Sequence, residues 1–205
     1  AGKTTVAEAL AYLTGVTKGM GKVADGNTIS DYDKEEIKRQ FSISTTMVPI
    51  EYEGAEGKIK INLLDTPGYF DFVGEVEEAV SAADAAIIVV NCKAGIEVGT
   101  EKAWDLCEEY KLPRIIFVTN MDDDHASFRE LILKLEKKFG RKIAPFQVPI
   151  RENEKFVGFV NAVKMQGRRF TNLSDYEDCE IPEYTKKNLG IIRDALIEAV
   201  AETSE

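Results

Sequence analysis

The sequence predicts an α/β protein with a mostly parallel sheet covered by helices on both faces, followed by a small α+β lobe. Two observations support this prediction. Up to about residue 140, short apolar runs alternate with amphipathic stretches of roughly 10–15 residues, which is the pattern of parallel strands joined by helices. After that point, short strand-like segments follow one another through tight turns. We therefore expect one domain at residues 1–140 and a second, smaller one at 141–205.

Composition excludes several classes of protein. The 205 residues are 44% hydrophobic, enough for one substantial core, and no apolar run approaches the roughly 20 residues of a membrane span. The formal net charge of −10 argues against a protein that binds nucleic acid through its phosphates, so we expect no sequence-specific nucleic-acid binding. Cys92, Cys107 and Cys179 are odd in number and form no C-x-x-C pattern, which indicates the reduced thiols of a cytoplasmic protein.

Apolar spacing predicts the elements of the first domain in turn. Residues 4–13 have the spacing of a helix, and the glycine-rich and charged stretch from 15 to 40 is expected to be mobile. The strand at 85–90 is apolar without alternation, as in a central parallel strand covered on both faces. The full set after residue 40 is strands at 45–52 and 58–64 with a turn at 54–57, a helix at 72–83, the strand at 85–90, a helix at 100–110, a strand at 114–118 and a helix at 125–139.

The second domain has a different texture. The segments A-P-F-Q-V-P-I, K-F-V-G-F-V-N-A-V-K-M and R-R-F-T-N-L have the character of short strands, and a final helix is expected at about 182–203. The acidic stretch D-Y-E-D-C-E at 175–180 is interpreted as a solvated face. We find no catalytic signal in this domain.

The first chemical signal is A-G-K-T-T at the start of the chain, directly before the first helical pattern. Phosphate-binding loops read G-x-x-x-x-G-K-[ST] and lead from a strand into a helix. In such a loop Lys3 reaches the β- and γ-phosphates, Thr4 binds Mg²⁺ and the N–H groups of the helix N-terminus meet the anion. The alternative is an ordinary exposed helix start. The candidate phosphate-binding residues are Ala1, Gly2, Lys3, Thr4 and Thr5.

The second signal is the apolar strand that ends in I-N-L-L-D-T-P-G. In nucleotide hydrolases this pattern supplies an aspartate near Mg²⁺, here Asp65, and a glycine whose N–H meets the γ-phosphate, here Gly68. The alternative is a plain turn, because Asp, Pro and Gly are turn residues. A G-K-T about sixty residues upstream favours the nucleotide site, and the candidates are Asp65, Thr66, Pro67 and Gly68.

The third signal is R-I-I-F-V-T-N-M-D-D-D, a buried strand that ends in a carboxylate-bearing loop. Guanine-specific proteins use N-K-x-D at this place, where the aspartate accepts hydrogen bonds from N1 and N2 of the base. If the end of the strand sets the register, the motif is Thr119, Asn120, Met121 and Asp122. A register one residue later restores the asparagine and selects Asp123. Both registers lack the lysine, and a solvated acidic loop is the remaining alternative.

These residues resemble a known family. The run DTPGYFDFVGEVEEAVSAADAAIIVVNCKAGIEVGTEKAWDLCEEYKLPRIIFVTNMD resembles the GTP-binding domain of elongation factor G and its relatives, the ribosomal-protection proteins among them. GKVADGNTISDYDKEEIKRQFSISTT resembles the first switch of that family. PIRENEKFVGFVNAVKMQGRRF resembles the insert that elongation factor G carries within its GTPase domain. The resemblance covers essentially the whole chain and implies a P-loop fold with an inserted subdomain at 141–205.

The resemblance also implies cofactors, partners and roles. GTP or GDP and Mg²⁺ are the expected ligands, and the ribosome with its stalk proteins is the expected partner of a monomeric cytoplasmic factor. Thr4, Ser42 and Asp65 would hold the metal, and Lys3, Gly68 and Tyr69 would take the catalytic positions. By this likeness, the first strand, the start of the phosphate loop and the guanine loop of S-A type lie outside the sequence, so we expect poor nucleotide retention by the chain as it stands.

Three departures from the family fall on nucleotide-contacting motifs. The family's D-T-P-G-H has a histidine that helps orient the attacking water, but here Tyr69 stands at that position and the only histidine is His125. The family's R-G-I-T-I becomes R-Q-F-S-I, which keeps a metal-binding hydroxyl in Ser42 and replaces a glycine with Gln40. The third departure is T-N-M-D, for which we expect weaker nucleotide affinity with guanine preference retained through Asp122.

Three hypotheses follow. The first is a GTPase of elongation factor G type whose turnover is reduced, because a phenol cannot carry the positive charge of an imidazolium against a phosphate. The second is a GTP-binding regulator on the ribosome with negligible intrinsic hydrolysis. The third, an ATP-dependent P-loop enzyme, is opposed by Asp122 and by the family resemblance.

Overall fold

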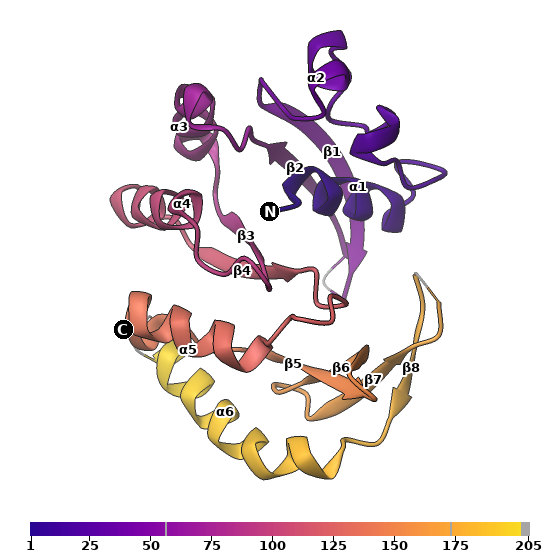
Figure 1. Cartoon of the computed structure of the whole chain (residues 1–205), viewed down its shortest axis with the longest axis vertical. Helices are drawn as coiled ribbons and strands as arrows, with labels where there is room; N and C mark the ends of the chain where they lie inside the picture. The colour runs from indigo at the N-terminus through magenta and orange to yellow at the C-terminus, as the bar shows by residue number, and fades with distance from the viewer. Residues whose placement is uncertain (56, 173, 202–205) are drawn as a thin grey trace. The chain divides into compact units, whose positions relative to one another are not determined.

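The computed structural model describes residues 1–55, 57–172 and 174–201, without the side chains of 141 and 188. The chain divides into two compact units, and each is described by itself (Figure 1). The first unit comprises Ala1–Asn91 and Glu97–Thr119, and the second comprises Cys92–Ile96 and Asn120–Glu205. The helix that ends near residue 140 thus clusters with the lobe that follows it.

A helix and a hairpin form the first half of the first unit. Helix α1 (Lys3–Leu13) packs on the antiparallel pair of β1 (Thr46–Gly54) and β2 (Gly57–Asp65). The register pairs Val48 with Leu63 and Ile50 with Ile61, so these apolar side chains share the face on which Ala11 of α1 packs. The helix is therefore fixed beside the strand that ends in D-T-P-G.

The second half of this unit alternates helices and strands. After a short 3₁₀ turn (Phe70–Phe72) come α3 (Val73–Ala82), β3 (Ala86–Asn91), α4 (Val98–Glu109) and β4 (Arg114–Thr119). Strands β3 and β4 are parallel, with Asn91 opposite Thr119 at their carboxyl ends. The guanidinium of Arg114 lies 3.9 Å from the centroid of the Trp104 ring, which fixes α4 to the start of β4.

The prediction of a mostly parallel sheet is confirmed only in part. Among the described residues, β3–β4 is the parallel pair, whereas β1–β2 and all strand pairs of the second unit are antiparallel. The reason is the length of the connections. A tight turn such as that between Gly54 and Gly57 can join only antiparallel strands, because parallel strands need a long crossover connection.

The charged stretch before β1 contains regular structure that the sequence analysis did not predict. It forms a 3₁₀ turn (Val23–Asp25) and helix α2 (Lys34–Arg39). Asp33 and Glu36 make a capping box at the start of α2, a D-x-x-E signal that is visible in the sequence. Gln40 ends the helix with φ of 58°, so the residue that replaces the family's glycine does adopt a left-handed conformation. Mobility of this stretch stays a prediction.

The second unit contains a four-stranded antiparallel sheet between two helices in the sequence. Its strands β5 (Gln147–Glu152), β6 (Lys155–Asn161), β7 (Gln166–Phe170) and β8 (Tyr176–Cys179) lie in chain order. Helix α5 (Phe128–Phe139) and a 3₁₀ turn (Gly140–Lys142) precede the sheet, and α6 (Glu183–Ala201) follows it. Helix α6 packs on one face of the sheet (Figure 1), with Leu189 against Ile150 and Val160.

Strand β8 lies in the acidic stretch, and most of its side chains are exposed, in line with the interpretation as a solvated face. Its pairing with β7 is supported by Arg168, whose guanidinium lies 4.3 Å from the centroid of the Tyr176 ring and near Asp178. The acidic sequence of this segment therefore does not reveal that it is a strand whose backbone completes the sheet. In the described part of the chain, no helix combines the length and the apolar character that crossing a membrane requires.

Replacing Leu189 with alanine should destabilise the second unit. Leu189 is 1% exposed and fills the core between α6 and the sheet, so Leu189→Ala is expected to cost about 2–5 kcal/mol of unfolding free energy. Ile191 on the same helix is 71% exposed, and Ile191→Ala should stay within about 0.5 kcal/mol of the parent. Urea unfolding of both variants checks this, and equal losses would contradict the packing described above.

Candidate functional site

The N-terminus of α1 presents a lysine beside carboxylates. Gly2 precedes the helix with φ of 89°, and no side chain of the described residues caps this end. Lys3 is half-buried near Asp65, Asp31 and Glu97. Burial lowers the pKa of Lys3, and the three carboxylates oppose this by raising it. A partly desolvated ammonium and uncapped helix N–H groups together favour an anion at this position.

The D-T-P-G turn delivers Gly68 to the same ammonium. A Cβ atom placed on Gly68 would lie 2.9 Å from Nζ of Lys3, closer than van der Waals contact allows. The absence of a side chain therefore lets the backbone of this turn approach Lys3. Thr66 is half-buried and Pro67 is buried, whereas Thr5, on α1, is exposed to solvent.

Hydroxyl groups from three segments meet next to Lys3. Oγ1 of Thr4 and Oγ of Ser42 are 3.2 Å apart. Ser42 donates a hydrogen bond to Oδ1 of Asp31 (2.6 Å), and Ser30 donates one to Oδ2 of Asp65 (2.7 Å). The structure thus brings together Lys3 and Thr4 of the first motif, Asp65 and Gly68 of the second, and Ser42 of the charged stretch.

This cluster carries more negative than positive charge. Asp31 and Asp65 are 4% and 5% exposed, and burial raises the pKa of both carboxyl groups. Hydrogen bonds from Ser42 to Asp31, and from Ser30 and Thr4 to Asp65, lower these pKa values in part. Oδ2 of Asp31 is buried and has no hydrogen-bond partner among the residues that the structure describes. Two buried carboxylates beside one lysine favour a cation in the cluster.

The donor set fits Mg²⁺. Two adjacent ligands of an octahedral ion at about 2.1 Å are separated by about 3 Å, close to the 3.2 Å between the hydroxyls of Thr4 and Ser42. Mg²⁺ prefers oxygen ligands and keeps several waters or phosphate oxygens, so few protein ligands are needed. The described residues contain no group of three or more His, Cys, Asp or Glu side chains placed to hold a metal.

Asp31 is a site residue that sequence analysis missed. It lies in the charged stretch among other acidic residues, and the sequence does not show which of them is buried and which is solvated. Its hydrogen-bond donor is Ser42, which was identified only through the family resemblance.

Three more carboxylates hold the charged stretch in place, and sequence analysis missed these too. Glu8 of α1 is 1% exposed and accepts hydrogen bonds from the backbone N–H groups of Gly21 (2.8 Å) and Ile29 (2.7 Å). Glu36 accepts from the N–H groups of residues 43 and 44, and Glu75 accepts from that of residue 45. Their bonds fix the backbone on both sides of Asp31 and Ser42 to the rest of the unit.

Tyr69 lies at the edge of this cluster. It is 55% exposed, and its ring centroid is 4.5 Å from that of Phe41, with the ring planes tilted by 52°. Phe41 directly precedes Ser42, so the aromatic pair joins the D-T-P-G turn to the segment that carries the second hydroxyl.

The residues of the third motif divide between the two units. Thr119 ends β4 in the first unit, where its hydroxyl donates to the carbonyl oxygen of Ala1 at 2.9 Å. This bond ties the end of the strand to the start of the phosphate-binding segment. Asn120, Met121 and Asp122 belong to the second unit, where Asn120 has φ of 55° and Met121 is buried.

The two aspartates that compete for base recognition have different surroundings. Asp123 accepts a hydrogen bond from the N–H of His125 (2.9 Å) and pairs with Nζ of Lys93 (3.2 Å). These two contacts lower the pKa of Asp123. Asp122 is exposed to solvent. The carboxylate of Asp123 therefore stabilises the loop through these contacts. The exposure of Asp122 favours it as the carboxylate that can receive a ligand.

With the geometry in place, comparison with known proteins identifies the family. The model of the elongation factor Tu GTP binding domain matches residues 1–202. The chain belongs to this family. A crystal structure of a Thermus thermophilus protein is similar, at 35% identity and a TM-score of 0.91, with all of this chain and 30% of that chain covered. The predicted P-loop GTPase fold is confirmed, and the chain spans less than a third of the length of that relative.

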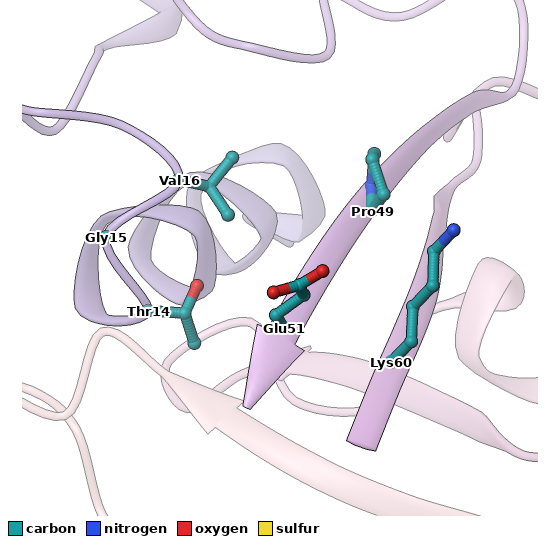
Figure 2. A pocket seen from close by; sticks show the side chains of 6 residues that line it. All are labelled: Thr14, Gly15, Val16, Pro49, Glu51 and Lys60. Carbon is teal, nitrogen blue, oxygen red and sulfur yellow. The ribbon is translucent and has the colours of Figure 1, made fainter. Parts of the chain in front are cut away.

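One groove of this GTP-binding domain lies at the opposite end of α1 from Lys3 and Thr4. It has a volume of about 400 Å³ at the carboxyl end of α1 (Figure 2). Its lining residues are Thr14, Gly15, Val16, Pro49, Glu51 and Lys60. Glu51 and Lys60 are register partners in the β1–β2 pair, so the groove carries one side chain of each charge.

Removing the hydroxyl of Ser42 should destabilise the GTP-binding domain. Ser42→Ala leaves the buried carboxylate of Asp31 without the hydrogen bond from this hydroxyl, which is expected to cost about 1–3 kcal/mol of unfolding free energy in Mg²⁺-free buffer. Ser44 is exposed and takes part through its backbone N–H, so Ser44→Ala should change stability by less than about 0.5 kcal/mol. Chemical denaturation compares the two, and a neutral Ser42→Ala would contradict the described network.

Proposed function

We propose that the chain is the GTP-binding domain of an elongation factor G-like translation factor that acts on the ribosome and hydrolyses GTP with Mg²⁺ at reduced turnover. The observation that carries the proposal is the convergence of Lys3, Thr4, Ser42, Asp65 and Gly68 around one anion- and cation-binding position. Membership of the elongation factor Tu GTP binding domain family supports GTP as the nucleotide that this site binds.

Each residue has a distinct role in the proposed site. The ammonium of Lys3 and the N–H groups at the start of α1 bind the β- and γ-phosphates, and the N–H of Gly68 meets the γ-phosphate. Thr4 and Ser42 provide hydroxyl ligands for Mg²⁺, with Asp65 and Asp31 close by. Mg²⁺, when bound, neutralises charge that develops on the phosphate oxygens. The carboxylate of Asp122 accepts hydrogen bonds from N1 and N2 of guanine.

Reduced turnover follows from the chemistry of Tyr69. Phosphoryl transfer depends mainly on positioning and on stabilising charge, and a residue that orients the attacking water contributes to the rate without being needed for binding. A phenol can donate and accept hydrogen bonds, but it cannot become a cation as imidazole can. We therefore propose that Tyr69 in place of histidine slows hydrolysis and does not by itself weaken nucleotide binding.

The second candidate function is a ribosome-associated GTP-binding regulator with negligible hydrolysis. The specific observation in its favour is the contact between the rings of Tyr69 and Phe41, because it holds the phenol against an aromatic surface. Both candidates share the proposed partners, which are guanine nucleotide and the ribosome with its stalk proteins. Both also assume a monomer in the cytoplasm, and these assignments rest on the family resemblance.

Turnover on the ribosome separates the two candidates. We expect slow phosphate release from GTP by the intact protein with saturating ribosomes, and an increase on the order of 100-fold for Tyr69→His, because a water-orienting imidazole is restored. Tyr110→His makes the same chemical change at the carboxyl end of α4 and should leave the rate unchanged.

Either of two results would count against this assignment. Rapid release by the unmodified protein would refute the idea of reduced turnover. No gain in Tyr69→His would mean that Tyr69 is not the limiting residue, and would favour the regulator.

Base recognition can be assigned to one aspartate by exchanging the nucleotide. Asp122→Asn should weaken GDP binding on the order of 100-fold and improve binding of xanthosine diphosphate, because the new amide can donate to the C2 carbonyl of xanthine. Asp123→Asn should leave the preference for GDP intact, since Asp123 serves the loop through Lys93 and His125. Fluorescence titration measures both, and a switch in Asp123→Asn alone would establish the other register.

A further inference from the structure

A side chain from the small sheet holds the loop that carries Asp122. Arg151, on β5, donates from Nη2 to the carbonyl oxygen of Met121 at 2.6 Å and from Nη1 to that of Glu154 at 2.7 Å. The planar guanidinium thereby joins two backbone segments of the second unit in a fixed geometry. Such charge-assisted bonds are among the stronger ones in proteins.

The bonded carbonyl lies at a sensitive point of the loop. The N–H of Asp123 donates to the carbonyl of Asn120 at 3.3 Å, which makes residues 120–123 a turn with Met121 and Asp122 at its centre. The carbonyl of Met121 belongs to the central peptide, whose orientation is the main difference between type I and type II turns. Because a peptide is planar, fixing its oxygen also fixes the direction in which the chain enters Asp122.

Arg151 is itself held by the last helix. The N–H of Arg151 donates to the phenol oxygen of Tyr184 at 3.0 Å, and that hydroxyl donates to the carbonyl of Arg151 at 3.1 Å. Tyr184 lies at the start of α6. A continuous set of hydrogen bonds therefore leads from α6 through β5 to the peptide before Asp122.

We propose that Arg151 is a positioning residue that orients Asp122 for guanine, so that the small lobe determines how strongly the base is recognised. The inference rests on the proposed function, in which Asp122 accepts hydrogen bonds from N1 and N2. Asn120 stands at the position where the family has a lysine, and the bond from Arg151 to Met121 provides a further contact that orders this loop. In this chain, Arg151 adds a restraint on the loop from another element of the fold.

The alternative is that Arg151 only cross-links β5 to the loop and stabilises the lobe. The two roles differ in their effect on nucleotide discrimination. Two parallel hydrogen bonds to guanine demand a precise carboxylate orientation, whereas inosine diphosphate lacks the 2-amino group and can make only one. Loss of orientation must therefore weaken GDP binding more than inosine diphosphate binding, while loss of stability weakens both alike.

The experiment measures dissociation constants of GDP and inosine diphosphate for the intact protein and for Arg151→Met, together with the thermal midpoint of each. We expect GDP binding to weaken about tenfold and inosine diphosphate binding much less, so that the ratio of the two constants falls toward one. Arg151→Lys should recover part of the ratio, because one ammonium can reach one carbonyl but does not reproduce the guanidinium fork. Tyr184→Phe should shift the ratio in the same direction by a smaller factor.

Arg169→Met is the matched control, because Arg169 lies in the same sheet and pairs with Glu152. It should leave the ratio unchanged. Equal weakening of both nucleotides in Arg151→Met, with a lowered thermal midpoint, would overturn the positioning role, as would an unchanged ratio at full stability. If the unmodified protein binds ADP as well as GDP, the proposed function itself fails, a result that is distinct from failure of the role of Arg151.

Discussion

Burial of two carboxylates beside a single lysine is the constraint on which the first unit depends. Asp31 and Asp65 are almost fully enclosed, and removing a carboxylate from water costs free energy unless it is paired or hydrogen-bonded. Contacts with Lys3, Ser30, Thr4 and Ser42 offset part of that free energy, yet one oxygen of Asp31 has no hydrogen-bond partner in the described part of the chain. A divalent cation would complete the compensation.

The scaffold brings these groups together through long-range contacts. Strand β2 ends at Asp65, and the core between the hairpin and α1 places that carboxylate beside Lys3. The charged stretch comes over this pair because Glu8, Glu36 and Glu75 bind its backbone N–H groups. Segments that are ordered by contacts to a bound phosphate are the usual switches of nucleotide hydrolases. In this chain, carboxylates restrain the segment that carries Asp31 and Ser42.

Sequence alone predicted the scaffold well and the site in part. Periodicity identified α1, the hairpin, β3, β4 and α6, because an apolar face or run is a local property of the chain. Lys3, Thr4, Asp65 and Gly68 were found because their spacing forms motifs, and the structure brings them together, although their roles stay predictions. Asp31, Glu8 and Arg151 were missed, since nothing in the letters shows which charged side chain is buried or which one binds a backbone carbonyl. Their partners are distant in the sequence, so only the folded chain reveals them.

The most direct test of the account is the Mg²⁺ dependence and base preference of nucleotide binding. Isothermal titration of the intact protein would compare a non-hydrolysable GTP analogue with its ATP counterpart, each with Mg²⁺ and with a chelator present. The account predicts that Mg²⁺ tightens binding of the guanine analogue, because it relieves the charge of Asp31 and Asp65, and that the adenine analogue binds at least about 100-fold more weakly. Equal affinity for the two bases, or binding that does not respond to the chelator, would contradict it.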